Sequence, residues 1–299
     1  MEADLGEHSR PTTARTRELG WELLLARKRA NLTGTKVAEE LGWSAGKLSK
    51  LERGWRSTSD WDYGTLLGKL GADPQTRERI HRIASEQDTG YFIRTFEGRL
   101  PDSLLCLSIH EGAAVTIADY ESIVVPGMLQ TEQYAKVMIN PDGELSAEEE
   151  NLLVGARLAR QAVLSGRNSP EAVYYIHEAA LHTMVSDNQV MHDQMLRLAF
   201  MCDWTRLTPR VIPLGTRGHA ALHSPFKLMT FPKHTAPIAY TEAPTATTFV
   251  EEPQAIDVYR SLEARLASVA LDGPQSKAVF MRWADEYDRR LQERGIEVA

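Results

Sequence analysis

The stretch LGWSAGKLSKLERG, residues 41 to 54, contains two short patterns that belong to known chemistries. A glycine followed by a lysine, Gly46-Lys47, suggests a loop that binds the phosphates of a nucleotide. Such a loop requires two glycines five positions apart and a serine or threonine directly after the lysine. Here Gly42 precedes Gly46 by only four positions, and Leu48 follows the lysine. The spacing therefore argues against a nucleotide-binding loop.

The second pattern, Ser44 with Lys47 three positions later, is the first element of the penicillin-binding enzymes. Those enzymes also need a Lys-Thr-Gly tripeptide further along the chain, and this sequence has none. Ser44 has a simpler role as the N-cap of a helix, because its hydroxyl can accept a hydrogen bond from a free backbone N–H of the first turn. We therefore expect no serine catalysis at this position.

Other candidate ligands and nucleophiles are also incomplete. His177 and His182 enclose a glutamate, but the zinc proteases place their histidines four apart on one helical face. A separation of five puts the two side chains about 140° apart around a helix. Cys106 and Cys202 form no Cys-x-x-Cys pair and have no recognisable base partner. The sequence predicts no metal, no cofactor and no catalytic residue, and two distant cysteines favour a reduced, cytoplasmic setting.

The chain around the opening stretch predicts a bundle of five short helices. Apolar residues recur at helical spacing in five runs, most of them preceded by an N-cap residue and separated by glycine. The second and third helices, joined by a turn at Gly42, form a helix-turn-helix. The expected helices cover residues 19–30, 34–41, 45–53, 60–70 and 74–85.

This pattern resembles the lambda-repressor and Cro type of helix-turn-helix, the xenobiotic-response-element family. The resemblance rests on Leu32-Thr33, Val37-Ala38, Leu41-Gly42, Ser44, Leu48-Ser49 and Leu51-Glu52 with Gly54. In such domains the third helix lies in the major groove of double-stranded DNA. The resemblance implies that DNA is contacted by Thr33, Thr35, Lys36, Ser44, Ala45, Gly46, Lys47, Ser49, Lys50, Arg53 and Arg56.

The cationic residues of this set each have two possible roles. Lys47 and Lys50 can reach guanine O6 and N7, or they can contact phosphates without reading sequence. Arg53 and Arg56 can clamp phosphates or remain solvated surface charges. Ala45 can contact only a thymine methyl group, so we expect few base contacts and a larger share of shape readout.

Glu52 has a different predicted role, because a carboxylate facing DNA would repel phosphates. In the lambda-repressor and Cro family, which this pattern resembles, the residue at this position pairs with an arginine of the first helix. Arg27 is the matching residue here. We therefore expect Arg27 and Glu52 to form a structural ion pair.

The charge of the chain is unevenly distributed. The whole sequence carries −7, yet residues 10–60 hold seven Arg and four Lys against five Glu and one Asp, a local charge of +5. Residues 1–9 carry −3, which leaves −9 for residues 61–299. Salt screens fields beyond about 10 Å, so the local patch governs contact with phosphates. A basic DNA-binding segment therefore belongs to an otherwise acidic protein.

The predicted fold class is mainly α, with a five-helix helix-turn-helix bundle and a C-terminal α+β domain that contains a small antiparallel sheet. The sheet is expected from β-rich runs at residues 172–176, 210–214, 226–231, 237–240 and 247–251. Residues 103–121 are expected to be helical. The predicted divisions are a flexible arm (1–16), a DNA-binding domain (17–86), a connector (87–101) and a regulatory and dimerisation domain (102–299).

The C-terminal part also resembles a known family. The strings VPGMLQTEQYA (125–135), GARLARQAVL (155–164), HEAAL (177–181) and SLEARLASVALDGPQS (261–276) are similar to the C-terminal domain of WhiJ-like regulators from filamentous, high-GC Gram-positive bacteria, the actinobacteria. The resemblance implies transcriptional regulation together with a small companion protein.

One surface for a ligand or partner is suggested by a tight turn that leads into a helix and by polar residues of a later long helix. Two simpler interpretations remain open: a turn that merely stabilises the fold, and a solvated helical face. The candidate residues are Pro126, Gly127, Gln130, Thr131, Tyr134, Arg157 and Gln161.

Together these patterns predict a cytoplasmic, nucleoid-associated transcriptional regulator that is not an enzyme. A homodimer is expected because one helix-turn-helix reads only half of a symmetric operator. The C-terminal domain would receive a small-molecule effector or a small protein. No apolar run approaches the roughly 18 residues of a membrane span, and the polar N-terminus does not resemble a signal peptide.

Two alternatives of other classes remain. The chain could be an antitoxin-like protein that sequesters a small partner and controls its own gene through the DNA-binding domain. It could also be an enzyme fused to a DNA-binding module, which a buried cluster of titratable residues in a deep pocket would favour.

Overall fold

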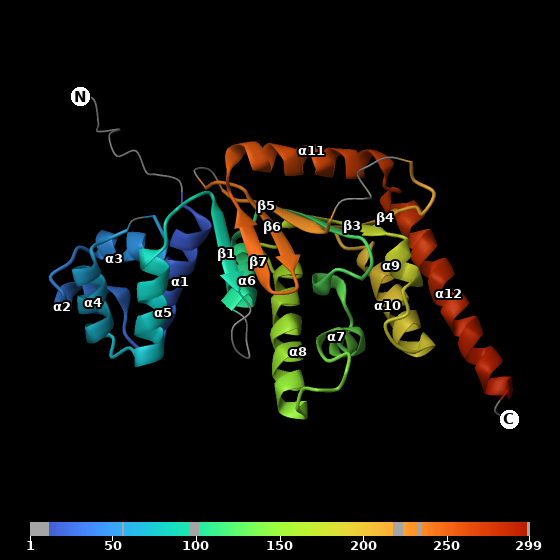
Figure 1. Cartoon of the computed structure of the whole chain (residues 1–299), viewed down its shortest axis with the longest axis horizontal. Coiled ribbons are helices and arrows are strands. Elements are labelled where there is room, and N and C mark those ends of the chain that lie inside the picture. The colour runs from blue at the N-terminus through green and yellow to red at the C-terminus, as the bar shows by residue number, and fades with distance from the viewer. Residues whose placement is uncertain (1–11, 56, 96–101, 218–223, 233–234, 298–299) are drawn as a thin grey trace.

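The computed structural model describes residues 12–55, 57–95, 102–217, 224–232 and 235–297. A bundle of short helices lies at one end of the long axis, and a sheet covered by longer helices makes up the rest (Figure 1). The two parts have separate hydrophobic cores. The helical bundle is called the N-terminal domain below, and the rest of the described chain is called the C-terminal domain.

The N-terminal domain contains the five predicted helices. They are α1 (Ala14–Arg29), α2 (Gly34–Glu40), α3 (Ala45–Glu52), α4 (Asp60–Lys69) and α5 (Pro74–Ser85). Each begins at a threonine, serine or aspartate whose side chain accepts a hydrogen bond from the backbone N–H of the first turn. Leucine, isoleucine and valine side chains from all five helices fill the core. The local signals in the sequence thus determine this domain.

The sheet of the C-terminal domain has seven strands in the described residues, in the order β1-β7-β6-β5-β2-β3-β4. The strands are β1 (Tyr91–Thr95), β2 (Thr116–Glu121), β3 (Glu171–His177), β4 (Leu207–Ile212), β5 (Phe226–Thr230), β6 (Ile238–Ala243) and β7 (Ala246–Val250). Strand β3 pairs in parallel with both β2 and β4, and the other pairs are antiparallel.

The prediction of a small antiparallel sheet is therefore wrong. The five predicted strands are present, but two further strands enlarge the sheet and make it mixed. Strand β2 occupies the end of the segment predicted as one helix, because α6 (Asp102–Ala113) stops before it. Strand β1 lies inside the predicted connector, residues 87–101, and pairs with β7. Residues 96–101 of that connector lie outside the described residues.

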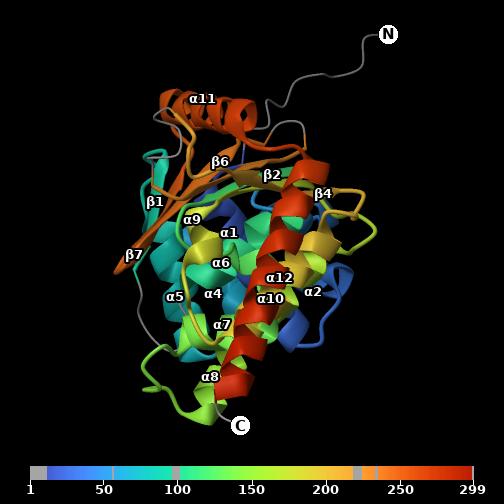
Figure 2. The same cartoon turned by 90° about the vertical axis from the view of Figure 1, so that its right-hand side faces the viewer.

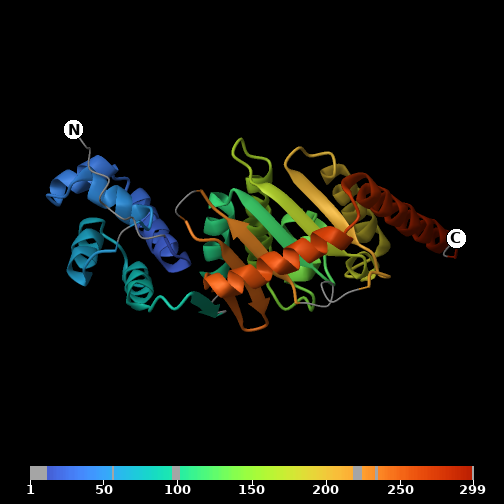
Figure 3. The same ribbon diagram turned by 90° about the horizontal axis from the view of Figure 1, so that it is seen from above.

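Helices cover both faces of the sheet. Helix α11 (Pro253–Val269) crosses one face (Figures 1 and 3). It buries Leu262 and Leu266 in one cluster with Tyr175 and Leu228. The other face carries α6, η1 (Gly127–Leu129), α7 (Glu132–Ile139), α8 (Ala147–Gln161), η2 (Ala162–Leu164), α9 (Ala179–His182), α10 (Asn188–Met201) and α12 (Gly273–Glu297). Helix α12 runs beside α10 (Figure 2), at the end farthest from the helix-turn-helix (Figure 1). The sheet is thus the middle of three layers.

A buried group of charges fixes the helices to the sheet. Arg160 of α8 donates two hydrogen bonds of 2.9 Å to the carboxylate of Glu111 on α6. The same carboxylate accepts from Lys227 of β5, whose Nζ also lies 3.2 Å from Asp119 of β2. Burial alone would raise the pKa of Glu111, but Arg160 and Lys227 lower it to about 2. Charges of both signs are present, so the group is compensated internally.

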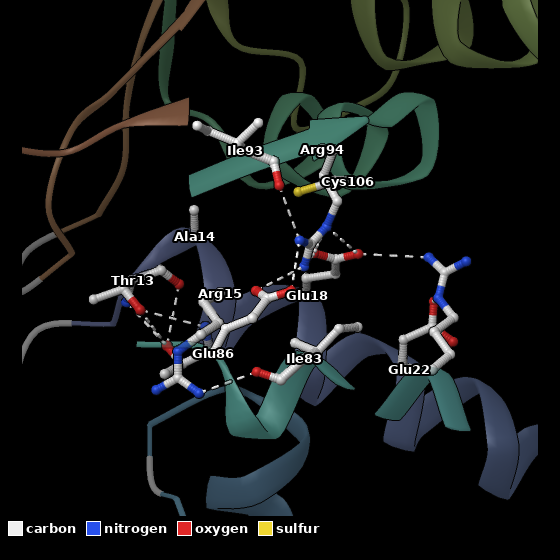
Figure 4. A network of polar contacts seen from close by, with 12 residues as sticks. Thr13, Ala14, Arg15, Glu18, Glu22, Ile83, Glu86, Ile93, Arg94 and Cys106 are labelled. Atoms are coloured by element: carbon white, nitrogen blue, oxygen red, sulfur yellow. Dashed lines mark hydrogen bonds and ion pairs between the residues drawn. The ribbon is translucent and has the colours of Figure 1, made fainter. Parts of the chain in front are cut away.

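The two domains are joined through α1 and β1. The backbone N–H of Ala14 donates to Glu251, which directly follows β7, over 2.7 Å, and Arg17 pairs with the same carboxylate at 2.9 Å. From β1, Arg94 reaches Glu18 of α1 and Glu86 at the end of α5, each at 2.8 Å (Figure 4). Arg94 and Glu18 are buried. This junction fixes the helix-turn-helix domain to the sheet.

The predicted flexible arm, residues 1–16, is only partly described. Residues 1–11 lie outside the described residues, and the rest of the arm is ordered, contrary to the prediction. Thr12 is buried and bridges to Thr235, and Thr13 caps α1. The physical reason is the capping box of Thr13 and Thr16, which begins the helix at Ala14.

Candidate nucleic-acid interface

The third helix, α3, presents one face to solvent and is called the recognition helix below. Ser44 caps it by accepting a hydrogen bond from the backbone N–H of Lys47 over 3.1 Å. Leu48 and Leu51 anchor the inner face and are each 2% exposed. The opposite face carries exposed positions at both ends of the helix. These are Ser44, Ala45, Gly46, Lys50 and Arg53, with Ser49 half-buried beside them.

The start of α2 lies beside this face. Thr33 caps α2 and is exposed together with Thr35 and Lys36. The turn to α3 needs a backbone that most residues avoid: Gly42 has φ 65°, in the left-handed region that glycine adopts without strain. The backbone N–H of Trp43 then donates to the carbonyl of Ala38 over 2.8 Å. The two helices therefore keep the predicted helix-turn-helix arrangement.

An ion pair fixes the recognition helix to α1. Arg27 donates from Nε and Nη2 to the two carboxylate oxygens of Glu52, at 2.5 and 2.9 Å, and from Nη1 to the carbonyl of Leu32 at 2.8 Å. The hydrogen bonds with Glu52 raise the pKa of Arg27. The predicted structural pair is present, and Glu52 is half-buried against its partner.

A second attachment, which the sequence reasoning missed, is a close approach of two backbones. A Cβ atom on Gly20 of α1 would lie 2.6 Å from the backbone nitrogen of Gly54, at the end of the recognition helix. Gly54 in turn has φ 69°, and a Cβ atom on it would lie 2.4 Å from the carbonyl oxygen of Thr16. Only glycine fits at both positions. The predicted helix 19–30 placed Gly20 near its start, so the sequence contained no signal for this contact, whereas in the structure Gly20 lies well inside α1.

Lys47 departs from the predicted role of an open contact. Its Nζ lies 2.7 Å from Oδ2 of Asp62 on α4 and 3.8 Å from the centroid of the Trp43 ring. Its side chain is half-buried as a result. Sequence reasoning did not identify Asp62, because nothing in the spacing places α4 beside the recognition helix.

The remaining predicted contacts lie around the same face. Arg53 is exposed, and its guanidinium carbon lies 5.1 Å from the ring centroid of Trp55. Trp55 and Trp61 are exposed aromatic residues in the segment that follows the recognition helix, with Trp61 82% exposed. Arg56 lies outside the described residues.

Comparison with protein families assigns both parts of the chain. Residues 18–80 match a family model described as a helix-turn-helix domain. Residues 106–282, more than half of the chain, match the model described as a domain of unknown function (DUF5753). The chain belongs to the DUF5753 family. No curated protein matches it. A DUF5753 domain preceded by a helix-turn-helix supports a DNA-binding regulator.

In the DUF5753 domain, the residues predicted as a ligand or partner surface are largely internal. Pro126 is buried, as are Gln130 and Tyr134, which are 2% and 0% exposed. The hydroxyl of Tyr134 accepts from the backbone N–H of Val125 over 3.2 Å, and the Gln130 side chain donates to the Val125 carbonyl over 2.8 Å. Thr131 caps α7. These contacts fix the turn η1.

The two residues predicted on α8 serve the same turn. Arg157 donates to the side-chain oxygen of Gln130 over 2.8 Å. The Gln161 side chain donates to the carbonyls of Gly127 and Gln130 at 3.1 and 2.9 Å and accepts from Arg197 of α10 at 2.7 Å. Arg157 and Gln161 therefore hold the turn through hydrogen bonds, and a role of these residues in binding a ligand or partner stays a prediction.

Two segments of the DUF5753 domain that resemble parts of catalytic motifs have structural roles. Ser186-Asp187-Asn188, a tripeptide that occurs in penicillin-binding enzymes, caps α10 through Asp187. The ring of His182 packs edge-on against the ring of Trp283, with the two ring centroids 4.1 Å apart. Within the described residues no three histidine, cysteine, aspartate or glutamate side chains gather as a metal site. In that part of the chain no helix is both long and apolar enough to cross a membrane.

Proposed function

We propose that this chain is a sequence-specific transcriptional regulator of the lambda-repressor and Cro type. The observation that carries the proposal is the capped recognition helix, held at two points by α1, with an exposed outer face and exposed cations beside it. A helix presented in this way fits the major groove. The family match of residues 18–80 supports the same class.

The exposed residues divide into two groups by chemistry. Ser44, Ala45 and Gly46 stand at the N-terminal end of the recognition helix, where this fold type approaches base edges. Their side chains are small and offer one hydroxyl, so direct readout is sparse and DNA shape contributes more. The cations and hydroxyls around them contact phosphates. These are Thr33, Thr35, Lys36, Lys50 and Arg53.

The regulator acts as a homodimer, because one helix-turn-helix reads a half-site. The DUF5753 domain supplies the dimer contact and the regulatory input, a small effector or the small companion protein that the WhiJ-like resemblance implies. Its function on DNA places the protein at the nucleoid, in the cytoplasm.

The test is a selection of binding sequences from a random duplex pool at about 150 mM salt, a condition at which phosphate contacts alone bind weakly. Wild type should enrich an inverted repeat. Arg53→Ala should weaken binding to every sequence and reduce the slope of log affinity against log salt by about one. Arg167→Ala, which removes an exposed arginine of the DUF5753 domain, is the matched control and should change neither. No enrichment with wild type would contradict the proposal.

A further inference from the structure

Lys47 of the recognition helix is held by groups of the protein itself. Its ammonium group lies 2.7 Å from the Asp62 carboxylate and 3.8 Å from the centre of the Trp43 ring. The same carboxylate oxygen of Asp62 accepts a hydrogen bond from the hydroxyl of Thr58. The Lys47 and Asp62 side chains are 20% and 24% exposed. The lysine is therefore docked on its own domain, in a partly desolvated site.

This pairing changes what the recognition helix offers to DNA. A lysine surrounded by water gains affinity for any phosphate by releasing counterions, whatever the sequence. Lys47 must instead give up the carboxylate and the aromatic face, and its departure leaves the negative charge of Asp62 beside a polyanion. Lys47 therefore adds little to the affinity for DNA of arbitrary sequence.

We propose that Asp62 is a specificity-determining residue, which suppresses sequence-independent binding by holding Lys47; this role rests on the DNA-binding function proposed above. At the operator, an acceptor held at the right place by the docked helix, such as guanine O6 or N7, can replace or share the carboxylate. At a random duplex no such acceptor is aligned. The Asp62 carboxylate then provides sequence discrimination, because it weakens binding to DNA that lacks the operator sequence.

The chain contains a matched pair for comparison. Lys69 at the end of α4 lies 2.8 Å from Glu40 at the end of α2, and both side chains are about a third exposed. Glu40→Gln removes one negative charge and releases one lysine in the same domain, as Asp62→Asn does. It leaves the recognition helix untouched. The comparison therefore distinguishes the effect of removing the charge at Asp62 from the effect of removing any one negative charge of the domain.

The experiment measures binding of the full chain to its selected operator and to a random-sequence duplex by fluorescence anisotropy, from about 50 to 300 mM salt. Asp62→Asn should bind the random duplex about fivefold more tightly at 150 mM salt, with a salt slope steeper by about one. Operator affinity should rise less, so the ratio of the two affinities falls. Asp62→Glu, which keeps the charge, and Glu40→Gln should both resemble wild type.

Thermal melting followed by circular dichroism verifies that each variant is folded. Should Asp62→Asn melt below the assay temperature, Asp62→Ser replaces it, because serine keeps an oxygen acceptor at the start of α4. Unchanged random-duplex affinity and slope in a folded variant, or an equal gain in Glu40→Gln, would overturn the role of Asp62 alone. If neither wild type nor the Asp62 variants bind any duplex, the proposed DNA-binding function fails and this inference fails with it.

Discussion

Single residues decide how the recognition helix is held, and two of them are glycines. Gly20 and Gly54 allow α1 and the end of α3 to touch backbone to backbone. The ion pair of Arg27 with Glu52 supplies the polar part of the same contact. A side chain at either glycine would meet main-chain atoms, which cannot turn aside as a flexible side chain does.

Gly20→Ala should therefore destabilise the protein strongly, by about 3 kcal/mol, the upper range for overpacking. Gly64→Ala is the matched control, because a Cβ on that glycine of α4 meets nothing within 4 Å. It should stabilise the protein by roughly 1 kcal/mol, the difference in helix propensity between the two residues. Urea unfolding of both variants measures the difference, and equal effects at the two sites would contradict the close-approach argument.

A second prediction at this scale concerns Glu121 at the end of β2. Burial, followed by the negative charge of Asp119, raises its pKa from 4.5 to about 8. The folded protein keeps this proton to about pH 8, whereas the unfolded chain releases it near pH 4.5. Stability contributed by the protonated group is thus present below pH 4.5 and lost as the pH rises towards 8.

Glu121→Gln should remove this loss, because glutamine mimics the protonated acid and does not titrate. The variant should be more stable than wild type at pH 8 and nearly equal to it at pH 4.5. Chemical unfolding at a series of pH values tests this, with Glu144→Gln on an exposed loop as a control for the removal of one charge. Parallel stability curves for wild type and Glu121→Gln would contradict the assignment.

At the scale of elements, predictability follows how local the signals are. The helices of the DNA-binding domain are each defined by a cap and a few apolar residues within one segment, so sequence patterns locate them. Strand β2 has both faces covered and its inner four residues buried, which removes the alternation that identifies a strand. In β1 the exposed Ile93 and the buried Arg94 reverse the expected pattern.

The candidate site shows the same division. The exposed end of the recognition helix and the pair of Arg27 with Glu52 were predictable from spacing and family resemblance. The pairing of Lys47 with Asp62 was not, because it depends on where α4 packs. Gln130 and Tyr134 were predicted at a surface, yet long-range packing of α8 and α10 buries them. Tertiary packing, which spacing does not record, made the difference.

At the scale of the whole molecule, the junction between the domains depends on buried charges. Arg94 is 3% exposed and Glu18 is 0% exposed, and Arg94 joins Glu18 to Glu86 (Figure 4). Removal of one partner of a buried pair leaves an uncompensated charge and costs about 3–5 kcal/mol. That cost falls on the contact between the domains.

Arg94→Ala should therefore loosen the coupling of the two domains. Wild type should unfold in a single cooperative calorimetric transition, and the variant in two, with the helix-turn-helix domain melting first because its core is smaller. Arg265→Ala, an exposed arginine on α11, is the control and should keep one transition. A single transition in Arg94→Ala would show that the charged junction does not couple the domains.

Helix α1 carries a consequence for how this protein can be taken apart. Its first turn is hydrogen-bonded to Glu251 of the sheet domain, its middle contacts the end of the recognition helix at Gly20, and its last turn pairs with that helix through Arg27. A fragment cut between residues 87 and 93 would carry away Glu18 and leave Arg94 behind. The DNA-binding part is therefore not an interchangeable cassette: transplanted onto another carrier, it would need a new counterion for Glu18 and a new anchor for the start of α1.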